Sequence, residues 1–68
     1  MTEQERKDLK VGDRVLVEHR NYKYVTATVV QIAIPLSASF EKETMFLLSY
    51  GMFGRKRWFK AYYVMAKL

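Results

Sequence analysis

The residues best suited to chemistry lie in one basic and aromatic segment near the C-terminus, Arg55–Lys60 (RKRWFK). Because side chains alternate along a strand, one face would carry Arg55, Arg57 and Phe59, and the other Lys56, Trp58 and Lys60. The strand pattern described below predicts a small barrel, and such a barrel needs a large residue near its closing turn. We therefore expect Trp58 to fill the core. That choice leaves Arg55 and Arg57 on the outer face, where guanidinium groups can bind phosphates. We therefore predict a nucleic-acid-binding surface formed by Arg55, Lys56, Arg57 and Lys60. The alternative is a charged strand that only keeps the domain soluble.

Aromatic side chains close to these cations would add base stacking. Four such residues fall on two turns of the strand pattern described below, the first hairpin and the turn after the third strand: Tyr22, Tyr24, Tyr50 and Phe53. Bases stack on aromatic rings with little regard to sequence. We assign all four to the nucleic-acid site, with packing in the core as the alternative for each tyrosine.

Little in the sequence supports catalysis or metal binding. The single histidine, His19, stands beside Arg20 at an expected solvated strand end, and there is no cysteine. The carboxylates are spread over residues 1–43 without a pair at acid–base or metal-ligand spacing. Gly51 and Gly54 are not followed by the Lys-Ser/Thr pair of a phosphate loop. We therefore predict no enzyme activity, no catalytic residue, no metal site and no cofactor.

A larger protein is the alternative partner. Pro35–Glu43 (PLSASFEKE) should form a surface loop, because proline cannot donate to a ladder and the serines and charges favour solvent. Leu36 and Phe40 in this loop, together with the adaptable Met52, would form an apolar docking surface. Small regulators and phage-encoded inhibitors of host machinery often have this make-up, so such a docking protein is the alternative function. Docking on a protein therefore stays open beside nucleic-acid binding.

Length and composition set the class of molecule. The chain has 68 residues, no cysteine, 50% hydrophobic and 15% aromatic residues, which is typical of one small folded domain. It contains no long apolar run, and its charged start lacks the apolar segment of a secretory signal. We expect a cytoplasmic protein, monomeric or weakly self-associating, with no membrane partner.

The net charge of +5 is concentrated at one end of the chain. Residues 1–43 contain seven basic and seven acidic side chains, whereas residues 44–68 contain five basic and no acidic ones. Such a one-sided positive field attracts anions, above all nucleic acid.

Five short strands should position these residues. The alternation of apolar and polar residues, with breaks at turn residues, predicts strands at Val11–His19, Tyr24–Ile34, Thr44–Tyr50, Arg55–Phe59 and Val64–Leu68. Turns are expected at Arg20–Lys23, Gly51–Gly54 and Lys60–Tyr63.

The strands should close into a small all-β, five-stranded antiparallel barrel over residues 10–68, because closure removes exposed strand edges. Its expected core is Val15, Val17, Ala27, Val29, Phe46, Leu48 and Trp58. Residues 1–9 should form a flexible arm or a short helix, in which Thr2 and Glu5 fit a capping box.

Several segments resemble the SH3-like barrel superfamily, which includes Tudor, chromo-barrel and KOW domains. VGDRVLVEH (Val11–His19) and YVTATVV (Tyr24–Val30) are similar to the first two strands of Tudor-type barrels. FLLSYG (Phe46–Gly51) resembles the Tudor strand and turn, with Ser49 in place of the Tudor aspartate. FKAYYVMAKL (Phe59–Leu68) resembles the closing turn and strand of SH3 domains.

The resemblance implies an SH3-like barrel and a binding function rather than one particular family. In Tudor domains, aromatic residues near Tyr22, Tyr24, Tyr50 and Phe53 form a cage for a methylated cation. The missing aspartate and the local positive charge argue against such a cage here. The GDRV opening also resembles type II dihydrofolate reductase, whose Gln-Ile-Tyr active-site motif has no counterpart in Arg55–Leu68.

Overall fold

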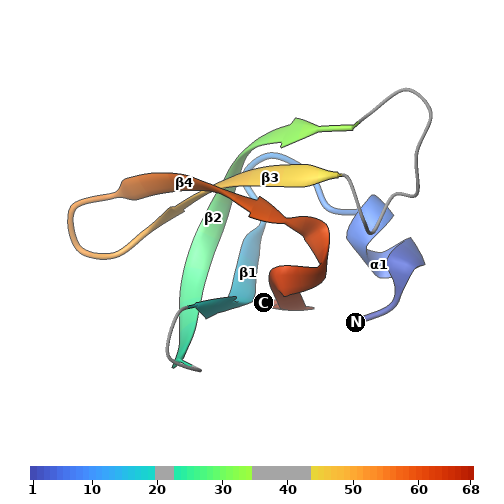
Figure 1. The fold of residues 1–68 in the computed structure, drawn as a ribbon, viewed down its shortest axis with the longest axis horizontal. Helices are drawn as coiled ribbons and strands as arrows, with labels where there is room; N and C mark the ends of the chain where they lie inside the picture. The colour runs from blue at the N-terminus through green and yellow to red at the C-terminus, as the bar shows by residue number, and fades with distance from the viewer. Residues whose placement is uncertain (20–22, 35–43) are drawn as a thin grey trace.

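The computed structural model describes residues 1–19, 23–34 and 44–68 as a small domain dominated by β-structure. In chain order its elements are the helix α1 (Glu3–Lys7), the strands β1 (Arg14–His19), β2 (Lys23–Ala33), β3 (Met45–Tyr50) and β4 (Arg55–Lys60), the 3₁₀ helix η2 (Ala61–Tyr63) and the strand β5 (Val64–Lys67). The expected small all-β domain with five strands is confirmed (Figure 1). No helix in the described ranges is long and apolar enough to cross a membrane.

The five strands form one antiparallel sheet in the order β4-β3-β2-β1-β5. The expected closure of the barrel is wrong, because in the described part of the chain β4 pairs only with β3, and β5 only with β1. The chain passes from β4 to β5 through η2. The two ends of the sheet are therefore joined by a turn and by packing of Ala61 and Val64 in the core, not by a hydrogen-bonded ladder.

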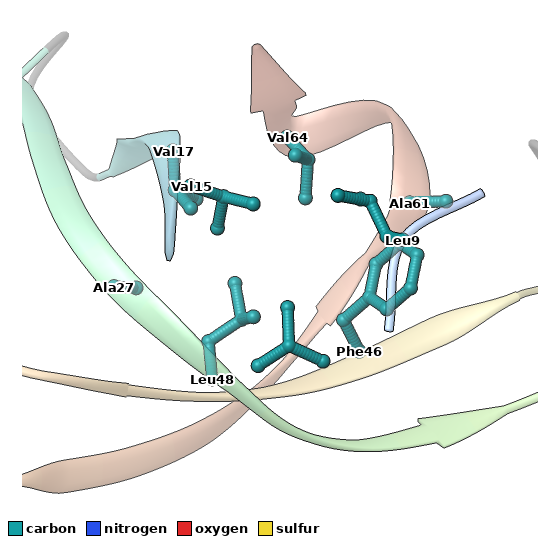
Figure 2. Close-up of a cluster of buried hydrophobic side chains, with 9 residues drawn as sticks. Leu9, Val15, Val17, Ala27, Phe46, Leu48, Ala61 and Val64 are labelled. Carbon is teal, nitrogen blue, oxygen red and sulfur yellow. The ribbon is translucent and has the colours of Figure 1, made fainter. Parts of the chain in front are cut away.

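The core lies on one face of the strongly twisted sheet, where side chains from several strands point toward a common centre (Figure 2). It consists of Leu9, Val15, Val17, Ala27, Val29, Phe46, Leu48, Ala61 and Val64. The six strand residues from β1, β2 and β3 were expected there from their alternation, and that prediction is confirmed. Burying each larger side chain of this kind contributes roughly 1.5–3 kcal/mol, so the shared face is what holds the sheet together.

A bulge in β2 changes which side chains in the second half of the strand face the core. Val29 is paired with Leu48, but Gln31 is paired with Leu47, so one extra residue of β2 lies between these pairs. A bulge of one residue reverses the alternation along the strand. Ile32 therefore returns to the core side, opposite Phe46.

The N-terminal segment forms a helix that is attached to the sheet. Thr2 and Glu5 make both hydrogen bonds of the predicted capping box. Arg6 is buried and donates from Nε and Nη2 to the backbone oxygen of Val64, at 3.3 and 3.1 Å. Leu9, just after the helix, lies in the core. These contacts hold the N-terminus against the start of β5.

Candidate nucleic-acid interface

The register of β3 and β4 decides which side of the sheet each β4 side chain occupies. Phe59 pairs with the core residue Phe46, and Trp58 pairs with Leu47. Directly paired residues on neighbouring strands lie on the same face. Phe59 therefore turns toward the core, and Trp58 turns away from it and is 45% exposed. The prediction of a buried Trp58 is wrong: the expected alternation is correct, but the sides are interchanged.

This interchange also moves the two arginines. Arg55 pairs with Tyr50 and Arg57 with Leu48, so both lie on the core side of the sheet and not on its outer face, as had been expected. Both are nevertheless exposed. Arg55 is the first residue of β4, next to the turn that closes the β3–β4 hairpin, and this turn projects beyond the rest of the sheet in Figure 1.

The two predicted lysines lie on the opposite face of the same strand. Lys56 pairs with Ser49 and Lys60 with Met45, on the side that Trp58 occupies, and both lysines are exposed. The structure thus brings the four predicted cations onto one strand but divides them between two faces. In the described residues, no carboxylate forms an ion pair with any of the four, whereas Lys67 lies 3.7 Å from Asp13.

A turn of four residues, Gly51–Gly54, closes the hairpin. Gly51 and Gly54 have φ values of +79° and +65°, which favour glycine, and Gly54 donates its N–H to the Gly51 carbonyl at 3.3 Å. Between them Met52 and Phe53 are 92% and 91% exposed. The hairpin therefore ends in two large apolar side chains with solvent around them.

Tyr50 belongs to an aromatic cluster next to the core. Its ring centroid lies 5.2 Å from that of His19 and 5.9 Å from that of Phe59, and its Oη lies 3.2 Å from His19 Nε2. His19 was expected at a solvated strand end, and this is wrong: its side chain is partly buried against these rings. Tyr50 packs against the core, so it is less available for stacking than its sequence position indicated.

The aromatic cluster continues to the turn before β5. Phe59 lies 6.3 Å from Tyr63 between ring centroids, and Tyr63 lies 4.7 Å from Tyr62. Hydrogen bonding to Tyr62 raises the pKa of the Tyr63 phenol above its ordinary value. Sequence reasoning did not assign Phe59, Tyr62 or Tyr63 to the site. The pairing of Phe59 with the core residue Phe46 places Phe59 in this aromatic cluster.

The remaining predicted residues lie elsewhere. Tyr24 is exposed on β2, where it pairs with Glu18. The β2 residue that lies level with the basic strand is Thr28, because Thr28 pairs with Ser49 and Ser49 pairs with Lys56. Tyr24 lies four residues along β2 from Thr28. At about 3.3 Å per residue, this separation is about 13 Å along the strand alone, so Tyr24 is not adjacent to the basic strand. Other assigned residues lie outside the described part of the chain: Tyr22, Leu36 and Phe40.

Metal coordination and comparison with known proteins add no further site. In residues 1–19, 23–34 and 44–68, no group of three or more His, Cys, Asp or Glu side chains is arranged to hold a metal ion. Comparison of the chain with protein-family models gave no match, and neither did comparison with curated proteins or with solved structures. The hairpin of β3 and β4 is thus defined as a candidate site by its own geometry and charge.

Proposed function

We propose that this domain is a non-catalytic binding module that holds nucleic acid with low sequence specificity through the β3–β4 hairpin. The observation that carries the proposal is the exposure of Arg55, Lys56, Arg57 and Lys60 on β4, the strand at one end of the sheet order, in a third of the chain without acidic residues. Phosphate contacts supply affinity without reading sequence, which accounts for the low specificity. A cytoplasmic location belongs to the same proposal.

The proposed fold relationship is to SH3-like barrels of the Tudor, chromo-barrel and KOW type. The sheet order and the 3₁₀ turn that precedes the last short strand support it. The missing hydrogen bonds between β4 and β5 would make this an open member of that superfamily.

A protein-docking module is the second candidate. It is favoured by the outer edge of β4, which pairs with no further strand among the described residues, and by the exposure of Met52, Phe53 and Trp58, which give an apolar surface along the same hairpin. The two candidates make different predictions about anions, because a protein partner need not be a polyanion.

The test is a titration of labelled single- and double-stranded DNA and RNA at low salt. Wild-type protein should bind, and Arg55→Ala with Arg57→Ala should bind much more weakly. The matched control is Lys10→Ala with Lys23→Ala, which removes the same charge from two exposed positions off the hairpin and should retain most of the affinity. No binding of wild-type protein to any nucleic acid would refute the proposal and favour protein docking.

A further inference from the structure

We infer that the nucleic acid is single-stranded and that one of its bases stacks on Trp58, on the face of β2, β3 and β4 that is turned away from the core. We call this face the outer face of the sheet. The inference rests on the proposed function, and it names the class of substrate and the residue that would recognise it. It follows from the side chains that the strand register places on the outer face.

The register assembles a row of side chains that ends in Trp58. Trp58 pairs with Leu47 on β3, and Leu47 pairs with Gln31 on β2. Directly paired residues lie on the same face, so all three belong to the outer face. Trp58 and Gln31 are exposed, and Leu47 is half-buried between them. Among the described residues, Trp58 takes no part in the ring contacts of the aromatic cluster. A large flat ring is therefore presented to solvent.

A lysine stands on each side of this ring. Lys56 and Lys60 each lie two residues from Trp58 on the same face of β4, which is about 7 Å along the strand. Their partners on β3 are uncharged, Ser49 and Met45. The strands β2, β3 and β4 contain no aspartate or glutamate. A polyanion lying on these strands would meet two cations with an aromatic ring between them, and no carboxylate of these strands would repel it.

This combination selects a single strand over a duplex. In a duplex the bases are paired and stacked on their neighbours, so the phosphates can reach the lysines but no base face can reach the indole ring. Unpaired bases can be splayed out and stacked on an aromatic side chain while basic side chains beside it hold the phosphates. Only a single strand therefore uses both the ring of Trp58 and the two lysines that flank it.

The experiment uses the fluorescence of Trp58, which is the only tryptophan of the chain. The protein is titrated at low salt with oligothymidylate, with oligouridylate and with a DNA duplex of equal length. The single strands should quench the fluorescence and bind more tightly than the duplex. The stacked base and the phosphates are common to DNA and RNA, so quenching by either single strand supports the inference, and the tighter ligand identifies the sugar.

Variants of Trp58 separate stacking from charge and from folding, with binding followed by the anisotropy of a labelled single strand. Trp58→Leu should weaken binding about fivefold or more, because it removes the stacked ring. The slope of log affinity against log salt should stay unchanged, since stacking releases no counterions. Trp58→Phe should retain most of the affinity. Both replacements are apolar, so equal melting temperatures of the two variants would assign a difference in binding to the aromatic ring.

Two further variants test the position of the site. Lys56→Ala with Lys60→Ala should reduce the steepness of the salt slope by about 1.4, because each lost phosphate contact on a single strand removes about 0.7. Tyr24→Ala removes an exposed aromatic side chain that pairs with Glu18, away from the basic strand, and should leave binding unchanged. An equal loss of affinity in Tyr24→Ala and Trp58→Leu would contradict a site centred on Trp58.

The failures of the two proposals are distinguishable. If wild-type protein binds nucleic acid with steep salt dependence, but its fluorescence is unchanged and Trp58→Leu binds as wild type does, stacking on Trp58 is wrong and the proposed function stands. Tighter binding of the duplex than of either single strand would likewise overturn the inference alone. If wild-type protein binds no nucleic acid, the proposed function fails and the inference fails with it.

Discussion

Trp58 stands opposite Leu47 across the β3–β4 ladder, on the side of the sheet turned away from the core. The pair places two large apolar side chains on a face whose neighbouring β4 residues are Lys56 and Lys60. The indole ring is therefore part of a mixed basic and apolar surface, and the buried packing of β4 falls to Phe59.

This placement predicts a small stability effect for Trp58→Ala. Because the side chain is about half exposed, the substitution should lower the free energy of unfolding by about 1 kcal/mol. Phe46→Ala, in the core, should lower it by about 3–5 kcal/mol. Urea denaturation of both variants measures the difference, and a Trp58→Ala variant as unstable as Phe46→Ala would contradict the register described here.

The basic strand predicts a defined salt dependence. Three or four phosphate contacts imply a slope of log affinity against log salt of about −2 to −3 on single strands and about −3 to −4 on duplex DNA. Arg55→Ala with Arg57→Ala should reduce the steepness by between about one and two units, because each lost phosphate contact removes about 0.7 to 0.9. Both side chains are exposed, so the free energy of unfolding of this double variant should stay within about 0.5 kcal/mol of that of wild type. An unchanged slope would show that these arginines do not contact phosphates.

The attachment of α1 predicts a stability role for Arg6. Arg6→Ala removes two charge-assisted hydrogen bonds to the Val64 carbonyl and should cost about 1.5–3 kcal/mol in thermal or urea unfolding. Lys10→Ala, at an exposed position, serves as the control. Deletion of residues 1–8 should leave a dispersed amide spectrum at a lower melting temperature, because Leu9 and the sheet remain. An Arg6→Ala variant with wild-type stability would show that the helix does not hold the sheet.

The capping box predicts an acid-dependent loss of stability. Its hydrogen bond to the Thr2 backbone lowers the pKa of Glu5 below the ordinary 4.5. The unfolded state therefore binds the proton first, and the contribution of Glu5 is complete above about pH 4.5 and is lost as the pH falls through the lower folded-state pKa. Glu5→Gln should flatten the dependence of melting temperature on pH in that window. Parallel curves for variant and wild type would mean that the cap does not contribute.

Much of the fold could be predicted because local patterns determine it. Alternation along β1, β2 and β3 identified six core residues, and the Thr2 and Glu5 pair marked the start of α1. The tight turn expected before the last strand is present as η2. Each of these features depends on residues close together in the chain.

The side occupied by β4 could not be read from its own residues. A period of two fixes which residues share a face but not which face meets the core. The symmetric turn Gly51–Gly54 carries that information, since counting outward from it pairs Tyr50 with Arg55 and Phe46 with Phe59. The same limitation placed the arginines of the candidate site on the wrong face.

Contacts between distant strands were beyond sequence patterns. His19 on β1 meets Tyr50 on β3 and Phe59 on β4 only because the sheet twists and curves. The path of the chain through η2 likewise decides that β5 pairs with β1 and leaves the sheet open. Neither curvature nor path has a local signature in a single sequence.

Among the strands that the structure describes, β4 has no partner on its outer edge, and this affects how the protein behaves in concentrated solution. A free strand edge is a template on which a second copy can add its own strand, which leads to aggregation. Here the edge carries Arg55, Lys56, Arg57 and Lys60, and two such edges repel each other. At about 1 M salt the screening length falls to about 3 Å, so this repulsion is lost. The protein should therefore be more prone to self-association at high ionic strength than at low ionic strength.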